Sequence, residues 1–456
     1  MDAWNRGRRS RILVPVLRTL TARCSALAGA LALVLVVVRI ATAHATLIGS
    51  EPAAGSRLSS SPERIRLLFS EAVEPNLTKI SLIAADGKTI AISTSGDPHD
   101  VHAVIARVES PLGRGEYRVA WHVVSADGHP VGGSFLFGVA TNVDTTRVDT
   151  THLTEPPAVS DTHIWGPSVA GAPIVPALLR GAGVGCLIAL TGLLWFIVST
   201  RGNGATPLRV ALWLSVATPV LLIGHLVAWL ANTSPDQTLS TAWIATALGT
   251  TLGTIELIRT GASVLPLWAL GLARRPTLAL STSLVALLAS SAVGHSAAIQ
   301  PSWAIPSKAI HLVALAIWLG GVLWIVARHR DHMDDAAGIA RVSRVALWAV
   351  IVIAATGVIQ TILVVPAFRD LWSPYGGVLI AKIVGLVVLV GFGAYHRGLV
   401  TRVVAQEERA VQSLGTSVSR EVVVFCAVLI LAGFLAYLSP PIRAARATLP
   451  LASELR

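Results

Sequence analysis

The chain has 456 residues, of which 53% are hydrophobic and only 13% are charged. This composition excludes an ordinary soluble protein and places most of the chain in a membrane. The formal net charge is +11, but the basic residues lie at the start of the chain and between apolar stretches, which is the pattern of membrane topology. We therefore expect membrane lipid around most of the chain and no nucleic acid as a partner.

Residues 1–43 have the features of a secretory signal peptide. An Arg-rich start precedes an apolar run over 26–38 and small residues that end at Ala43. Arg39 interrupts the end of the run and supports the alternative of an uncleaved anchor helix. Cleavage after Ala43 would make His44 the first residue, and its α-amine and imidazole could together chelate one Cu(II), which favours nitrogen ligands.

Two further candidate ligands lie much later in the same outer region. Asp127 and His129 are two positions apart, so on an extended strand both side chains would point the same way. Asp and Gly are also common turn formers, so a simple turn is the alternative. The cysteines lie in the signal or in apolar stretches, and the only methionines are Met1 and Met333. An outer metal site must therefore use imidazole, carboxylate or amine ligands.

Residues 44–140 are predicted to form an all-β sandwich of normal domain size, about 100 residues. Short β-rich runs alternate with turn signals such as Asp86-Gly87. The runs are 65–69, 80–84, 89–92, 104–108, 117–124 and 135–139. Residues 141–175 are rich in Thr, Pro and Asp without apolar periodicity, which predicts a linker.

A polytopic α-helical membrane domain is predicted over 176–440, followed by a tail over 441–456. It contains about eight stretches that approach the roughly 20 residues needed to span a bilayer. They are 176–199, 208–231, 252–273, 277–297, 307–327, 344–365, 377–397 and 421–438. Glu256 and Arg259 interrupt the third stretch, but they lie one helical turn apart and could pair.

The arginines give the expected orientation, with the sandwich on the extracytoplasmic side of the plasma membrane. The three outer loops hold only Lys308 and Arg369. The tail, with three arginines, departs from the trend. The arginines of the cytoplasmic side are Arg201, Arg209, Arg274, Arg275, Arg328, Arg330, Arg341, Arg344, Arg397, Arg402, Arg409 and Arg420.

Four histidines in the apolar stretches are candidates for a copper path. This topology puts His225, His295 and His311 toward the sandwich and His396 toward the cytoplasm. Ionisable residues in membrane helices usually face a cavity or a pathway. The alternative is that each imidazole only hydrogen-bonds between helices. The basic side chains of Arg180 and Lys382 are expected to snorkel or pair rather than to bind a cation.

Several motifs resemble known families. In the outer region, FSEAVEP at 69–75 and WHVVSADGHP at 121–130, together with His44, resemble CopC, a secreted copper-binding β-sandwich. In the membrane region, GHS at 294–296, HLVALAIWLGG at 311–321, YGGVL at 375–379 and PP at 440–441 are similar to CopD, an eight-helix membrane protein. The order of modules resembles the fused, YcnJ-like CopC–CopD proteins of copper resistance and copper transport.

The resemblance implies an Ig-like, Greek-key sandwich in which His44, Asp127 and His129 bind Cu(II). It also implies that Glu71 lies behind these ligands, where it can orient a ligand or a water molecule. His99 and His102 occupy a polar loop, where weak metal binding and a plain surface role are both open. His122 is either near the site or merely exposed.

We therefore expect a non-enzymatic copper protein that captures Cu(II) outside and moves copper across the membrane. Import is expected rather than export. Cu(I) is compatible with the membrane step. A copper chaperone or a second copy of the chain is compatible with the role of protein partner. No Walker loop is visible, so ATP would not drive transport directly. One alternative is a sequestration and tolerance protein whose helices serve as anchor or sensor. An oxidative copper enzyme ranks last, because Asp127 would close the site.

Overall fold

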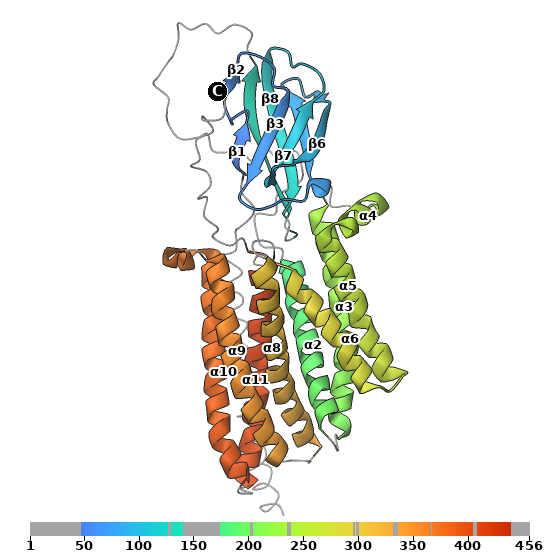
Figure 1. Ribbon diagram of the computed structural model, residues 1–456, viewed down its shortest axis with the longest axis vertical. Helices are drawn as coiled ribbons and strands as arrows, with labels where there is room; N and C mark the ends of the chain where they lie inside the picture. The colour runs from blue at the N-terminus through green and yellow to red at the C-terminus, as the bar shows by residue number, and fades with distance from the viewer. Residues whose placement is uncertain are drawn as a thin grey trace, which may run out of the picture.

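The computed structural model describes two units of the chain, a β-sandwich and a helical bundle (Figure 1). The described residues are 47–125, 128, 130–139, 174–200, 204–234, 239–294, 297, 301–331, 336–365, 367–404 and 408–438. The predicted signal peptide and tail lie outside them, as does the predicted linker except for residues 174 and 175, which belong to a helix.

The amino-terminal unit is a sandwich of two sheets with the orders β1-β3-β7-β6 and β2-β9-β8-β4-β5. The pairs are antiparallel except for β2 with β9. A short 3-10 helix, η1 (Pro75–Leu77), connects β3 to β4. The strands are β1 (Leu47–Glu51), β2 (Arg57–Leu58), β3 (Arg64–Phe69), β4 (Lys79–Ala84), β5 (Thr89–Ile90), β6 (Ile92–Asp97), β7 (Asp100–Val108), β8 (Gly115–Val124) and β9 (Pro130–Val139).

Apolar side chains that alternate along β3, β4, β8 and β9 form the core of the sandwich. Leu67, Leu82 and Val119 are fully buried, and Trp121 packs against Phe135 with ring centroids 6.0 Å apart. Alternation of this kind places every second side chain between the two sheets. The predicted all-β unit is therefore confirmed. Five of its six predicted runs lie within strands, and the run 89–92 covers β5 and the first residue of β6; β1 and β2 are additional.

The carboxyl-terminal unit is a bundle of long apolar helices. Two short 3-10 helices, η2 (Ser290–Ala292) and η3 (Phe368–Trp372), lie in its connections. The helices are α2 (Ile174–Ser199), α3 (Ala205–Thr233), α4 (Thr241–Gly249), α5 (Thr251–Gly271), α6 (Pro276–Ala289), α8 (Pro301–Arg330), α9 (Ala336–Val364), α10 (Pro374–Val404) and α11 (Glu408–Leu435).

Six helices in the described residues are long and apolar enough to cross a membrane: α2, α3, α8, α9, α10 and α11. The pair α4 and α5, bent by 94°, gives a seventh if it counts as one span. The predicted count of about eight is therefore approximate. The fourth predicted stretch gives only the short helix α6, because the chain leaves the helix near Ala289 and continues through η2.

The bundle packs most closely where α2 crosses α8. Gly192 of α2 and Gly320 of α8 face each other, and a side chain on either would collide with the opposite backbone. Small residues at a crossing let two membrane helices approach until their backbones touch. Around this crossing lie the buried side chains of Leu187, Ala316 and Leu319.

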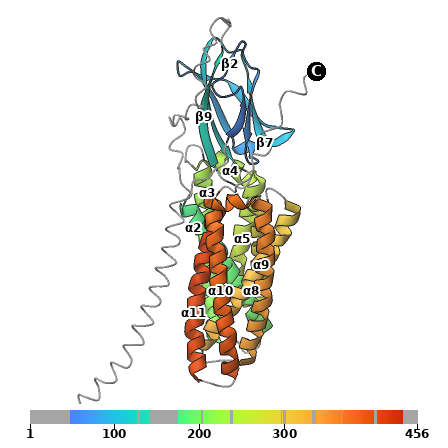
Figure 2. The ribbon, with the colours of Figure 1, turned by 90° about the vertical axis from the view of Figure 1, so that its left-hand side faces the viewer.

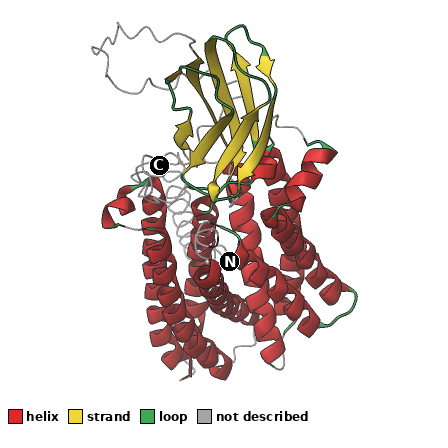
Figure 3. Ribbon diagram, turned by 45° about the horizontal axis from the view of Figure 1, so that its top comes forward, coloured by secondary structure: helices red, strands yellow, loops and turns green. Residues whose placement is uncertain are grey.

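The sandwich stands on one end of the bundle (Figures 1 and 2). The helix ends beneath it are the carboxyl end of α3 and the amino end of α5, and the short helix α4 contacts η1. In the tilted view of Figure 3, the strands of the sandwich rise away from the helices. The connection that follows α5, with Arg274 and Arg275, therefore lies at the far end of the bundle.

Candidate metal centre and buried membrane clusters

Three predicted ligands, His44, Asp127 and His129, lie outside the described residues, but the residues that flank them meet at one end of the sandwich. Leu47, three residues after His44, pairs with Phe69 at the end of β3. Val124 at the end of β8 pairs with Pro130 at the start of β9. Leu47 and Phe69 thus lie at one strand end, and Val124 and Pro130 at the other, and the bridge of Val73 to Ser125 joins the two.

Glu71 belongs to the same end of the sandwich. It is half-buried, and it lies two residues before an isolated bridge between Val73 and Ser125. The backbone N–H of Glu74 donates to the carbonyl of Val124 at 2.7 Å, which ties this segment to the end of β8. Burial raises the pKa of Glu74 above its ordinary value. The fold therefore brings the segment of Glu71 beside the strand that leads into the Asp127 loop.

The Asp127 loop rests on the membrane helices through Gly128. The indole Nε1 of Trp229 on α3 donates to the carbonyl oxygen of Gly128 at 3.0 Å. Gly128 has a φ of +95°, in the region that favours glycine. A β-carbon at this position would lie 2.5 Å from Leu252 Cδ2 and 2.6 Å from Trp229 Nε1. Only glycine therefore fits between the two proposed ligands while the loop is seated.

An apolar cluster surrounds this contact and joins the two units. Leu77 and Val124 of the sandwich pack with helical side chains that are all buried. Burial of apolar area contributes a stabilising free energy of roughly 25 cal/mol per Å², so this cluster holds the loop in place. The members from the bundle are the helical residues Trp229, Leu230, Ala247 and Leu252, and Val293 in the connection after η2.

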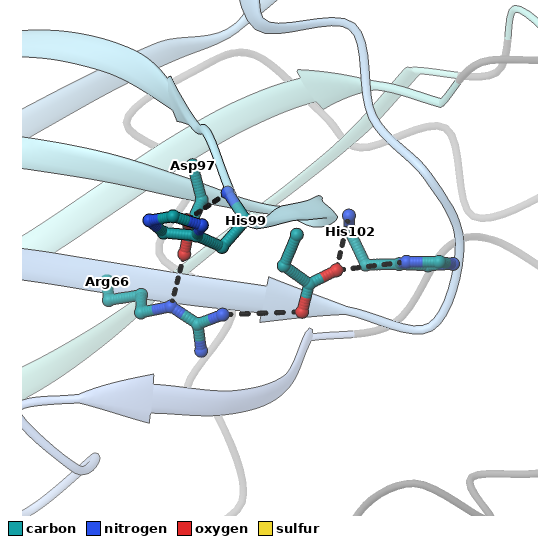
Figure 4. A network of polar contacts seen from close by, with 5 residues as sticks. Arg66, Asp97, His99 and His102 are labelled. Carbon is teal, nitrogen blue, oxygen red and sulfur yellow. Dashed lines mark hydrogen bonds and ion pairs between the residues drawn. The ribbon is translucent and has the colours of Figure 1, made fainter.

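His99 and His102 belong to a polar network at the β6–β7 turn (Figure 4). Arg66 contacts Asp97 at 2.8 Å and Asp100 at 3.3 Å. The backbone N–H groups of His99 and His102 donate to Asp97 and Asp100, each at 3.0 Å. The hydrogen bond from Arg66 holds the pKa of Asp97 below its ordinary value. Both carboxylates are thus engaged by Arg66, which favours a structural role for this loop.

His122 lies on β8, with Lys79 and Gly132 as its cross-strand neighbours. Only 8% of this residue is exposed. His122 was expected to lie either near the site or exposed at the surface, and its burial excludes the second alternative. Its strand ends two residues later, at Val124, where the Asp127 loop begins.

His225 lies in a buried polar cluster near the sandwich end of the bundle. Its Nδ1 is 3.2 Å from Arg259 Nη2, and its Nε2 is 2.9 Å from the hydroxyl of Tyr437. Arg259 also pairs with Glu256, as the spacing of these two residues predicts. Because a guanidinium only donates, Nδ1 must accept and Nε2–H must donate. Both ring nitrogens of His225 are therefore engaged in hydrogen bonds.

His311 on α8 has a different arrangement. Its Nδ1 is 2.8 Å from Thr356 Oγ1 on α9. The single hydroxyl proton of Thr356 goes to the carbonyl of Val352 at 2.6 Å. Nδ1 therefore donates its proton to Thr356, and the lone pair of the neutral ring lies on Nε2. A histidine that binds a metal commonly has this second hydrogen bond, which fixes the tautomer.

His396 on α10 lies near the opposite end of the bundle, in contact with α11. Its Nδ1 is 3.1 Å from Glu421 Oε2, and its Nε2 is 2.8 Å from Ser417 Oγ. Glu421 is only 1% exposed. A carboxylate next to Nδ1–H fixes the tautomer and the orientation of an imidazole.

The structure thus places the three described membrane histidines in three separate clusters. His295 lies outside the described residues. Within the described part of the chain, no three His, Cys, Asp or Glu side chains come together as a metal site. The partners Tyr437, Thr356, Ser417 and Glu421 were not identified from sequence, because each is 21 or more residues away from its histidine along the chain. Only the Glu256–Arg259 pair carries a local signal.

Two family models match the chain. The CopC domain matches residues 47–140, and copper resistance protein D matches residues 336–435. Protein YobA of Escherichia coli (strain K12) is 34% identical over 98 residues, which are 21% of this chain and 79% of YobA. Copper resistance protein C of Pseudomonas syringae pv. tomato is 36% identical over 109 residues, 22% of this chain and 83% of that protein.

Copper transport protein CutJ of Bacillus subtilis (strain 168) is 32% identical over 98 residues, 21% of this chain but 18% of CutJ. Among solved structures, CopC from Methylosinus trichosporium OB3b is 30% identical with a TM-score of 0.20, and covers 21% of this chain and 93% of that one. PcoC, a methionine-rich copper resistance protein from Escherichia coli, is 31% identical with a TM-score of 0.20 over 22% of this chain and 100% of that one.

The chain therefore belongs to the CopC family and, with its CopD domain, is a CopC–CopD fusion. Its function is copper-related, and its apolar helices make it a membrane protein. The families are those of copper resistance and copper transport proteins and are not known as enzymes.

Proposed function

We propose that the sandwich captures Cu(II) outside the cell and that the helices carry copper across the plasma membrane, inward. The α-amine and imidazole of His44, the carboxylate of Asp127 and the imidazole of His129 would bind Cu(II). Glu71 would orient one ligand or a water molecule from behind. These donors suit Cu(II), which prefers nitrogen and oxygen ligands in tetragonal geometry. The proposal requires cleavage after Ala43.

The observation that carries the proposal is the contact between Trp229 and Gly128. It seats the loop of Asp127 and His129 directly on α3, one helical turn from His225. A sandwich that served only to store copper would not need its metal loop against the helices. The seat supports direct transfer of copper from the loop into the bundle.

The distribution of charge supports an extracytoplasmic sandwich. The helix ends far from the sandwich hold Arg209, Arg274, Arg275, Arg328 and Arg341. Cytoplasmic ends of membrane helices are rich in Lys and Arg, so the opposite end, with the sandwich, faces outward.

Within the membrane, His311 and His396 support a path from the sandwich to the cytoplasm. His311 offers the lone pair of Nε2, and His396 has a carboxylate partner near the inner end. We include His295 and His225 as candidates near the entrance, where His225 would first have to leave Arg259 or Tyr437. Passage as Cu(I) would require one electron per copper ion from a donor outside the protein.

Sequestration without transport is the second candidate function. It is favoured by the separation of His225, His311 and His396, since no described group of three donors forms a metal site among the helices. The copper content of cells with and without the chain distinguishes the two functions. Import predicts higher cytoplasmic copper with the chain, whereas sequestration predicts copper retained on the outer domain and no change in the cytoplasm.

The site itself is tested by His129→Ala in the secreted domain. Loss of one ligand should lower the Cu(II) affinity at least tenfold, about 1.4 kcal/mol. His99→Ala is the matched control, because His99 lies at a neighbouring turn whose carboxylates are held by Arg66. Equal affinities of His129→Ala and the unmodified domain in a titration would reject the site.

A further inference from the structure

Two ionisable side chains lie one helical turn beneath the loop around Gly128. Trp229 of α3 and Leu252 of α5 lie against this glycine. His225 precedes Trp229 by four residues, and so lies on the same face of α3. Glu256 follows Leu252 by four residues, on the same face of α5. Because α3 ends and α5 begins at the sandwich, both steps lead from the loop into the bundle.

Both side chains are buried and contact one cation, the guanidinium of Arg259. His225 is 1% exposed, Glu256 2% and Arg259 1%. Nη2 of Arg259 lies 3.2 Å from His225 Nδ1 and also pairs with Glu256 Oε2. A single nitrogen of the guanidinium therefore contacts both an imidazole lone pair and a carboxylate oxygen.

The same two atoms have the spacing of two ligands of one metal ion. Nδ1 of His225 and Oε2 of Glu256 are 3.7 Å apart. Bonds from zinc to imidazole nitrogen and carboxylate oxygen are about 2 Å long. One ion of similar size can therefore reach both atoms from the place where Arg259 now contacts them.

Arg259 is held in the manner of a point charge. Arginine commonly binds a carboxylate through two parallel hydrogen bonds from two nitrogens. Here Nη2 serves both His225 and Glu256, while Nε is buried and has no hydrogen-bond partner among the described residues. A buried donor without a partner is unfavourable. The guanidinium is therefore held less firmly than a fully bonded one, which lowers the free energy needed to displace it.

We propose that His225 and Glu256 are ligands of a Cu(II) site at the sandwich end of the membrane helices, and that Arg259 is a tethered cation that occupies this site until copper displaces it. Imidazole and carboxylate suit Cu(II), whereas Cu(I) prefers sulfur ligands. The hydroxyl of Tyr437, 2.9 Å from His225 Nε2, fixes the tautomer with its lone pair on Nδ1. The copper would come from the loop of Asp127, so this site rests on the proposed function.

Arg259 keeps the carboxylate of Glu256 paired while copper is absent. A charge buried among membrane helices is costly unless it is paired. When Cu(II) displaces the guanidinium, one cation replaces another and the carboxylate stays compensated. Cations such as Mg²⁺ prefer oxygen ligands and gain little from the imidazole of His225. Arg259 would thus close this point of the bundle to them and yield to copper.

The proposal is tested by Cu(II) binding to the purified full chain in detergent, measured by competition with a chelator of known affinity. Arg259→Gln removes the tethered cation. This variant should therefore bind one more equivalent of Cu(II), with at least tenfold higher affinity than the unmodified chain has for that equivalent. The gain should disappear when Arg259→Gln is combined with His225→Gln or with Glu256→Gln. Any copper site on the sandwich contributes equally to all these proteins, so the difference reports the membrane site alone.

The matched control is Arg328→Gln, which also removes a buried guanidinium from the bundle. Arg328 is 8% exposed and lies at the end of the bundle far from the sandwich, with its guanidinium carbon 4.9 Å from the Trp324 ring centroid. Its replacement should leave Cu(II) binding unchanged. An equal gain in the control would overturn the proposal, because loss of any buried positive charge would then suffice.

Arg259→His decides the question if Arg259→Gln fails to fold. An imidazole at this position can pair with Glu256 when protonated, and it can serve as a third ligand when neutral. This variant should also bind one more equivalent of Cu(II) and lose it with His225→Gln. No additional Cu(II) in the variant that folds, or a gain that survives His225→Gln, would overturn the proposal. A gain in binding without copper uptake by cells would count against the proposed transport alone.

Discussion

Trp229 on α3 holds Gly128, 101 residues earlier in the chain, through a buried hydrogen bond of 3.0 Å from its indole Nε1 to the glycine carbonyl. The bond joins the loop between two proposed copper ligands to a helix that also carries His225. It makes the end of the sandwich that holds Gly128 part of the surface of the membrane domain. Sandwich and helices are therefore expected to respond to one another.

Replacement of Trp229 by Phe tests this connection. The variant keeps an aromatic ring but loses the hydrogen bond, which is worth about 1 kcal/mol, or roughly fivefold in an equilibrium. Hydrogen–deuterium exchange of a peptide over residues 124–132 in the full chain should therefore become about fivefold faster.

Trp243→Phe is the control for that measurement. The indole of Trp243 donates to the carbonyl of Leu230 at 3.4 Å, so its hydrogen bond stays within the helical domain. Exchange in the loop should not change. Equal acceleration in both variants would mean that the specific bond to Gly128 does not hold the loop.

Gly128→Ala should act in two ways. In the sandwich alone, the positive φ should cost about 1–3 kcal/mol of unfolding free energy, measured by urea denaturation. In the full chain the new methyl group would also push against Trp229 and Leu252 and release the loop, with faster amide exchange. Gly87→Ala is the control, because Gly87 has a φ of +83° but open space around it. If amide exchange in the loop around Gly128 were as slow in Gly128→Ala as in Gly87→Ala, this would contradict the packing of Gly128 against Trp229 and Leu252.

The hydrogen bond between His311 and Thr356 predicts the effect of Thr356→Val. Without the acceptor, the Nδ1–H tautomer is no longer fixed, and a metal ligand of this kind typically loses 10- to 100-fold in affinity. Uptake of radioactive copper into liposomes that contain the protein should fall by about tenfold. Thr361→Val, on the same helix, removes a hydroxyl that bonds only the carbonyl of Gly357 at 2.8 Å. It should transport normally, and equal rates in both variants would argue against His311 in the path.

The network of Arg66 gives a prediction for pH. The pKa of Asp97 is lowered in the folded state, so its ionised form stabilises the fold above the unfolded pKa of about 3.9. That contribution disappears as the pH falls through the lower, folded pKa. Arg66→Gln should therefore reduce the unfolding free energy of the sandwich by about 1 kcal/mol at pH 7. The difference should shrink toward zero at strongly acidic pH; a constant difference at all pH values would exclude the ion pair as its cause.

Local patterns were enough to predict the sandwich and most of the helices. Alternation around Leu82 and Val119 marks strands, and long apolar runs mark spans, because both signals depend only on neighbouring residues. Strands β1 and β2 were not predicted because they are short and contain or border Gly and Ser. The bend between α4 and α5 at Thr250 and the early end of α6 likewise depend on packing against other helices.

The site was predictable only in part, for the same reason. The pairing of Glu256 with Arg259 follows from their spacing on one helix. The contacts of His225 with Tyr437 and of His396 with Glu421 join separate helices, so no local pattern signals them. The role of Trp229 has no sequence signal at all, because an apolar helix in a membrane protein commonly carries tryptophan near its end.

The most direct test of the copper function compares two forms of residues 44–140, one that begins with a free His44 and one with a single extra residue before it. Relatives such as copper resistance protein C consist mostly of this module, so it can be studied by itself. Cu(II) binding is measured by calorimetry and electron paramagnetic resonance. We expect tight binding and a nitrogen-rich spectrum only for the form with His44 at its terminus. Equal binding by both forms, or by neither, would contradict capture of copper at the cleaved amino terminus.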